Sequence, residues 1–115
     1  VAFDTQHYLE WQLGAFRDLT QLPKNSKELL RILEEGWLIL GPHVEEIHLN
    51  DCDPRTGERN MFPGTGIMPL ADFCSMVQSS GWNGCVVPEV APQTLFPYSL
   101  KKLANLRETV ESYFI

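Results

Sequence analysis

Three short apolar runs in this 115-residue sequence each lead into side chains that are able to bind a metal ion. These side chains are Asp4 and His7 after the run 1–3, His48 within the alternating run 44–51, and Glu89 after the run 85–88. Carboxylates and imidazoles are ligands that divalent cations commonly take in proteins. The carboxyl ends of parallel strands meet at one edge of a sheet, so we expect these side chains to share one site there.

Each residue taken alone also has an ordinary structural explanation. Asp4 after a strand can cap a helix or form a turn, His48 can be a hydrogen-bonded core histidine, and Glu89 can be solvated. The joint arrangement favours the ligand roles, because an acid at the end of a buried strand needs a compensating partner. The role of Asp51 stays open between a partner of the ligands and a turn residue.

The segments between these runs carry helical patterns, with apolar residues three or four positions apart. The expected helices run from Tyr8 to Leu19, from Asn25 or Ser26 to Gly41, from Pro69 to Gly81, and from Ser99 to Phe114. Residues 52–63 are expected to form a loop with turn chemistry. The alternation of strands and helices predicts an α/β fold with parallel strands, crossover helices, and a sheet covered on both faces.

Composition narrows the class of protein. The length suits a single domain over residues 1–115, and the formal charge of −6, with scattered Lys and Arg, argues against nucleic-acid binding. The three cysteines show no CxxC spacing, so we expect a reducing, cytoplasmic setting rather than a disulfide framework. No apolar run approaches the roughly 20 residues that a membrane span needs. The sequence opens on Val1, within an expected strand, as a piece of a longer protein would.

Four motifs together resemble a known family. They are FDTQH at 3–7, IHLND at 47–51, PGTG at 63–66 and VPEV at 87–90. In their order and spacing the sequence resembles the carboxyl-terminal part of the xylose isomerase-like barrel proteins, the sugar phosphate isomerase/epimerase superfamily. The resemblance implies three consecutive βα units of a (β/α)8 TIM barrel. Such a partial barrel has open edge strands, so a missing amino-terminal barrel half or another copy of the chain is expected to cover them.

The resemblance also implies roles for individual residues. Asp4, His48 and Glu89 match three of the four ligands of a divalent metal (Mn²⁺, Mg²⁺ or Co²⁺, with Zn²⁺ as a further option), and the fourth ligand, a Glu, lies outside this sequence. His7 matches a substrate-binding histidine, and Arg59, with Arg55 as the alternative, is expected to contact substrate oxygens.

The reaction implied is the isomerisation or epimerisation of a sugar or sugar phosphate by proton abstraction alpha to a carbonyl, with Glu89 as a catalytic acid or base. With one ligand missing, the chain by itself is expected to bind metal weakly and to be inactive. Two alternatives remain open. One is a metal-dependent phosphodiesterase of the abasic-site endonuclease type, although the acidic charge and the lack of a His pair around 63–66 weigh against it. The other is a non-catalytic fragment that associates into homo-oligomers.

Overall fold

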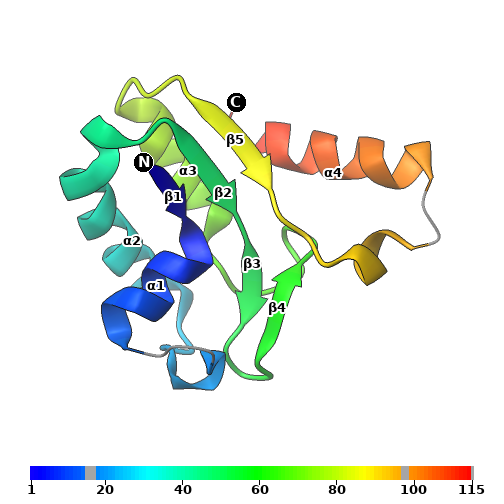
Figure 1. Ribbon diagram of the computed structural model, residues 1–115, viewed down its shortest axis with the longest axis horizontal. Coiled ribbons are helices and arrows are strands. Elements are labelled where there is room, and N and C mark those ends of the chain that lie inside the picture. The colour runs from blue at the N-terminus through cyan, green and yellow to red at the C-terminus, as the bar shows by residue number, and fades with distance from the viewer. Residues whose placement is uncertain (15–17, 97–98, 115) are drawn as a thin grey trace.

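The computed structural model describes residues 1–14, 18–96 and 99–114 (Figure 1). The helices are α1 (Thr5–Leu13), α2 (Ser26–Leu40), α3 (Leu70–Ser79) and α4 (Leu100–Ser112), and the strands are β1 (Ala2–Asp4), β2 (Glu46–Leu49), β3 (Asp51–Asp53), β4 (Glu58–Met61) and β5 (Cys85–Pro88). Short 3-10 turns occupy Leu19–Gln21, Gly41–His43 and Pro92–Leu95.

Strand β2 is the centre of a three-stranded sheet. It pairs in parallel with β1 on one side and with β5 on the other, in the order β1-β2-β5. Strands β3 and β4 form a separate antiparallel pair that extends beyond the carboxyl end of β2 (Figure 1). The prediction of parallel strands joined through helices is therefore confirmed.

The prediction of three consecutive βα units of a (β/α)8 TIM barrel is wrong. The described residues form a small α/β domain in which a separate antiparallel sheet accompanies the parallel one. The chain does not run directly from β2 through a loop to α3, because the expected loop contains the β3–β4 hairpin. Its turn is closed by the Asp53 carboxylate, which accepts a hydrogen bond from the Arg55 amide at 2.9 Å, and by Gly57 at φ +81°. This turn chemistry was visible in the sequence, but the short strands beside it were not.

The two faces of the parallel sheet differ in their chemistry. Side chains alternate between faces along a strand, so Phe3, Ile47 and Leu49 lie buried on one face of the sheet, the face on which Phe3 meets α2 and α3. Asp4 and His48 project from the opposite face, where their neighbours on the strands are only partly buried or exposed. The prediction of a sheet covered on both faces is wrong for the described residues, because the helices pack against one face only. The face that carries the polar side chains stays open.

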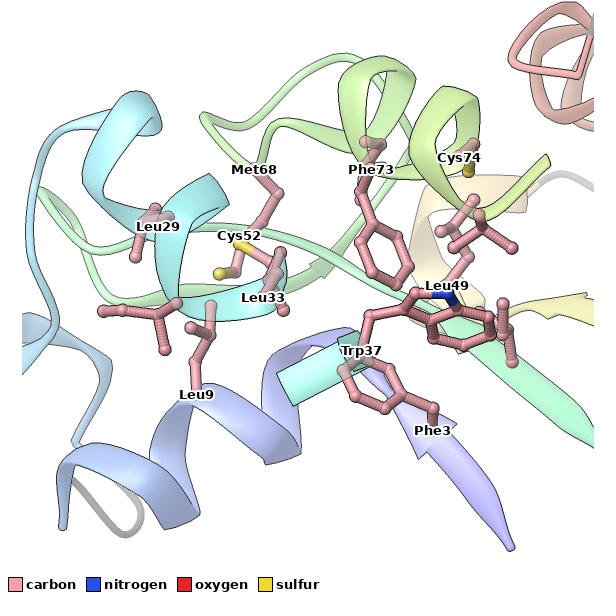
Figure 2. Close-up of a cluster of buried hydrophobic side chains, with 14 of the residues drawn as sticks. Phe3, Leu9, Leu29, Leu33, Trp37, Leu49, Cys52, Met68, Phe73 and Cys74 are labelled. Carbon is pink, nitrogen blue, oxygen red and sulfur yellow. The ribbon is translucent and has the colours of Figure 1, made fainter. Parts of the chain in front are cut away.

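A triangle of aromatic rings ties the helices to the sheet. The Phe3 ring lies 5.8 Å from that of Trp37 in α2 and 5.5 Å from that of Phe73 in α3, and the last two lie 6.0 Å apart (Figure 2). Burying each such side chain contributes about 1.5–3 kcal/mol. Helix α1 approaches α2 closely because Gly36 has no Cβ to overlap with the Tyr8 ring. The core therefore fixes β1 and the start of α1, the segment that carries Asp4.

The helix boundaries are partly as predicted. Asn25 caps α2 and Ser99 caps α4, whereas α1 begins earlier than expected, directly after Asp4, and ends at Gly14, whose φ is +67°. Residues 15–17 of the predicted first helix lie outside the described residues. No described helix is both long enough and apolar enough to cross a membrane.

The cysteines provide a test of the core. Burial raises the pKa of the Cys52 and Cys74 thiols to about 12, whereas Cys85 is exposed on β5. Because the thiolate is the reactive form, we expect iodoacetamide at about pH 8 to alkylate Cys85 alone in the folded protein. Intact-mass spectrometry should show one adduct on the native protein and three after denaturation in urea. Rapid native modification of all three thiols would contradict the packing described above.

Candidate metal site at the sheet edge

Asp4, His48 and Glu89 converge at the carboxyl end of the parallel sheet. One ligand atom from each lies within 4.8 Å of the other two, and all three residues are partly buried. His48 Nδ1 lies 3.0 Å from Glu89 Oε1 and 3.9 Å from Asp4 Oδ2. Within the described ranges, no other group of three His, Cys, Asp or Glu residues meets this geometry. Two carboxylates and one imidazole nitrogen this close together are a donor set that suits a divalent cation.

The strand register places the three side chains together. Asp4 is the last residue of β1 and lies directly across from His48 on β2. Glu89 follows β5 by one residue, and its amide donates to the Leu49 carbonyl at 3.0 Å, which extends the β2–β5 pairing past the end of the strand. The three residues come from distant parts of the sequence, and parallel pairing alone is enough to align them.

Asp4 divides its two carboxylate oxygens between two tasks. Its Oδ1 accepts hydrogen bonds from the amides of Gln6 at 3.0 Å and His7 at 2.8 Å, which caps the first turn of α1. Its Oδ2 faces the imidazoles of His48 and His7, with His7 Nδ1 at 3.0 Å. The capping role and the proposed ligand role of Asp4 are therefore compatible. His7 is 64% exposed at the rim, where its substrate-binding role stays a prediction.

Glu46 is a neighbour of the site that the sequence did not single out. Its Oε1 lies 2.6 Å from His48 Nε2, on the side of the imidazole ring away from Asp4 and Glu89. The two residues are two positions apart on β2 and therefore share a face of the sheet. That spacing is the signal from which the contact could have been found.

Asn50 is a buried hydrogen-bond partner of Glu89. It is fully buried, and its Nδ2 donates to Glu89 Oε2 at 3.5 Å. Its backbone is held by the Thr5 hydroxyl, which accepts from the Asn50 amide at 3.0 Å and donates to the Asn50 carbonyl at 3.0 Å. Asn50 Oδ1 is one of two buried side-chain oxygens without a hydrogen-bond partner in the described part of the chain. Asn50 therefore orients the oxygen of Glu89 that does not face His48.

Arg59 is engaged by a buried acid. Its Nη2 lies 2.6 Å from Glu10 Oε1, and the same oxygen accepts from Gln6 Nε2 at 3.0 Å. The pair ties β4 to α1, because Glu10 is almost fully buried while Arg59 remains one-third exposed. The alternative, Arg55, pairs with Asp53 at 2.9 Å in the hairpin turn. A substrate contact by either arginine stays a prediction, and the role of Glu10 was not anticipated.

Asp51 anchors the loop beside the site. Its fully buried carboxylate accepts four backbone amide hydrogen bonds, from Cys52, Gly64, Gly66 and Met68, at 2.8–3.1 Å. Burial raises the pKa of the Asp51 carboxyl, against the opposing effect of these amides. A Cβ at Gly66 would overlap the carboxylate, which explains the small residue there. Of the two roles left open above, the structure supports a loop-forming one.

Comparison with known proteins finds relatives, but their names state no function. The chain is 34% identical over 71 residues to two proteins named "Uncharacterized protein Mb0509", of Mycobacterium bovis, and "Uncharacterized protein Rv0498", of Mycobacterium tuberculosis. The match covers 62% of this chain and 23% of each relative, so the chain spans less than a quarter of their length. No family model and no solved structure matches the chain.

The anchoring role of Asp51 can be measured. Replacing it with Ala leaves four amides without their acceptor, so we expect Asp51→Ala to lower the free energy of unfolding by about 3–5 kcal/mol. Urea denaturation followed by circular dichroism would report the change. Glu108→Ala, at an exposed position on α4, is the control and should stay within about 0.5 kcal/mol of the parent protein. Equal stability of the two variants would refute the anchoring role.

Proposed function

We propose that this chain contributes Asp4, His48 and Glu89 as ligands for a divalent cation in a metal-dependent sugar or sugar phosphate isomerase or epimerase. The observation that carries the proposal is the convergence of the three ligand atoms within 4.8 Å at one edge of the parallel sheet. The resemblance in the motifs around these residues supports the reaction class. The resemblance implies Mn²⁺, Mg²⁺ or Co²⁺ as the cation, with Zn²⁺ as a further option.

The chemistry of the donor set fits such a cation. Glu89 and Asp4 bring two carboxylates to one edge, where their mutual repulsion costs energy unless a positive charge lies between them. The Glu89 and Asp4 oxygens both face the same nitrogen of His48, its Nδ1, so the three donor atoms lie next to one another. A divalent cation there would polarise a substrate carbonyl and stabilise the negative charge that develops on its oxygen.

The remaining residues have separate tasks in this proposal. Glu89 accepts or returns the proton alpha to the carbonyl. The Asn50 carboxamide holds the second oxygen of Glu89 through a hydrogen bond from Nδ2 to Oε2 at 3.5 Å. His7 at the exposed rim of the site binds a substrate hydroxyl or carbonyl. Arg59 contributes charge from β4, where Glu10 holds its guanidinium.

Metal binding can be tested on the 115-residue chain itself. Low concentrations of Mn²⁺ should broaden the NMR signals of residues around 4, 48 and 89 selectively, because paramagnetic broadening is local and detects weak binding. His48→Ala should weaken Mn²⁺ binding by more than about 100-fold, since even the loss of a residue that supports a ligand costs about 10- to 100-fold.

The matched control is His43→Ala, which removes an exposed histidine at the opposite end of the sheet. It should leave the broadening unchanged. Broadening that is spread evenly over the acidic surface, or that survives in His48→Ala, would contradict the site.

The reaction class can be tested in the longest natural protein that carries these residues. With Mn²⁺ present, we expect deuterium from D₂O to enter a ketose or ketose phosphate at the carbon alpha to the carbonyl. Glu89→Gln keeps the size of the side chain but cannot accept the proton, so the exchange rate should fall by at least about 100-fold. Cleavage of abasic-site DNA without any sugar exchange would favour a phosphodiesterase instead.

A further inference from the structure

We propose that Glu46 is a positioning residue that fixes the orientation and tautomer of His48 for metal binding. The inference rests on the proposed function, since it assigns a role within the same site. Its basis is the contact of 2.6 Å between Glu46 Oε1 and His48 Nε2. Neither the motifs nor the comparisons point to this residue.

The contacts of His48 divide between its two ring nitrogens. Nδ1 lies 3.0 Å from Glu89 Oε1 and 3.9 Å from Asp4 Oδ2, whereas Nε2 meets Glu46 alone among these three acids. A ligating nitrogen must present a lone pair, so the single proton of a neutral ring has to reside on the other nitrogen. Glu46 is placed to accept that proton in a hydrogen bond, which leaves the Nδ1 lone pair facing Asp4 and Glu89.

Without Glu46, His48 can adopt its other tautomer, which is unfavourable for metal binding. A neutral His48 would then place its proton on Nδ1, where Glu89 accepts it at a distance of 3.0 Å. That proton would occupy the position at which the cation must bind. Carboxylates that accept from the distal nitrogen of a ligating histidine generally set the tautomer and ring orientation in this way.

Glu46 reaches His48 along one face of β2. Alternate side chains on a strand start about 6.5 Å apart, so Glu46 and His48 must lean toward one another to meet. The residues that flank Glu46 in the sheet are Ala2 on β1 and Cys85 on β5. Neither side chain can carry a positive charge, so these neighbouring positions offer the Glu46 carboxylate no competing ion pair.

The experiment compares Glu46→Ala and Glu46→Gln with Glu45→Ala. Glu45 is the exposed preceding residue, directed to the other face of the strand, so its variant loses the same charge without touching His48. Mn²⁺ affinity is measured by adding Mn²⁺ to the protein and following the enhancement of nuclear relaxation that the bound ion causes. The tautomer of His48 is read from its ¹⁵N shifts in the metal-free protein at about pH 9, above the ordinary titration range of an imidazole.

We expect Glu46→Ala to weaken Mn²⁺ binding by about 10- to 100-fold and to shift His48 toward the Nδ1–H tautomer. Glu46→Gln should recover part of both effects, because its carboxamide oxygen accepts the same hydrogen bond. Glu45→Ala should match the parent protein. Parent-like affinity and tautomer in Glu46→Ala, with Mn²⁺ still bound at His48, would overturn this inference alone. Absence of Mn²⁺ binding by the parent protein would overturn the proposed function as well.

Discussion

The parallel pairing of β1 and β5 with β2 is the constraint on which the site depends. A shift of one residue in either pairing would turn a whole strand over and send its polar side chains into the core. The register is fixed by burial, because Phe3 and Ile47 lie opposite one another on the covered face. The same register places Asp4 opposite His48 on the open face. The hydrophobic core therefore aligns the ligands, although none of them belongs to it.

Several side chains combine a structural task with a chemical one. Asp4 caps α1 with one oxygen and faces the imidazoles with the other. Glu89 is held by Asn50 through the oxygen that does not face His48. Because each carboxylate is fixed through one oxygen and presents the second, the donors are held in place before a cation arrives. Such preorganisation lowers the entropic cost of assembling the site.

The sequence was sufficient to predict that Asp4, His48 and Glu89 lie together, but not to predict the structure around them. The alternation around His48 and the apolar runs before Asp4 and Glu89 predicted the strands, and parallel strands bring such residues together. The hairpin was missed because β3 has only three residues and carries two acids, so neither hydrophobic periodicity nor β propensity indicated it. The prediction of a barrel was wrong because it was inferred from the resemblance of motifs. Local motifs do not determine how many strands a sheet contains.

The contacts of Glu10 and Asn50 could not be read from the sequence for a different reason. Each depends on side-chain directions that emerge only when distant segments pack, as when Arg59 on β4 reaches Glu10 on α1. Residues on one element, such as Glu46 and His48, lie within reach of pattern reasoning. Residues that meet across elements require the packed fold.

Crystallography with bound Mn²⁺ would show directly whether Asp4, His48 and Glu89 share one cation. Crystals of this chain grown with Mn²⁺ would be measured on both sides of the manganese absorption edge, and the anomalous difference map would locate the ion. We expect one dominant peak about 2.0–2.2 Å from oxygens of Asp4 and Glu89 and from Nδ1 of His48. A well-ordered map with no peak between these three side chains, or with the peak elsewhere on the surface, would contradict it.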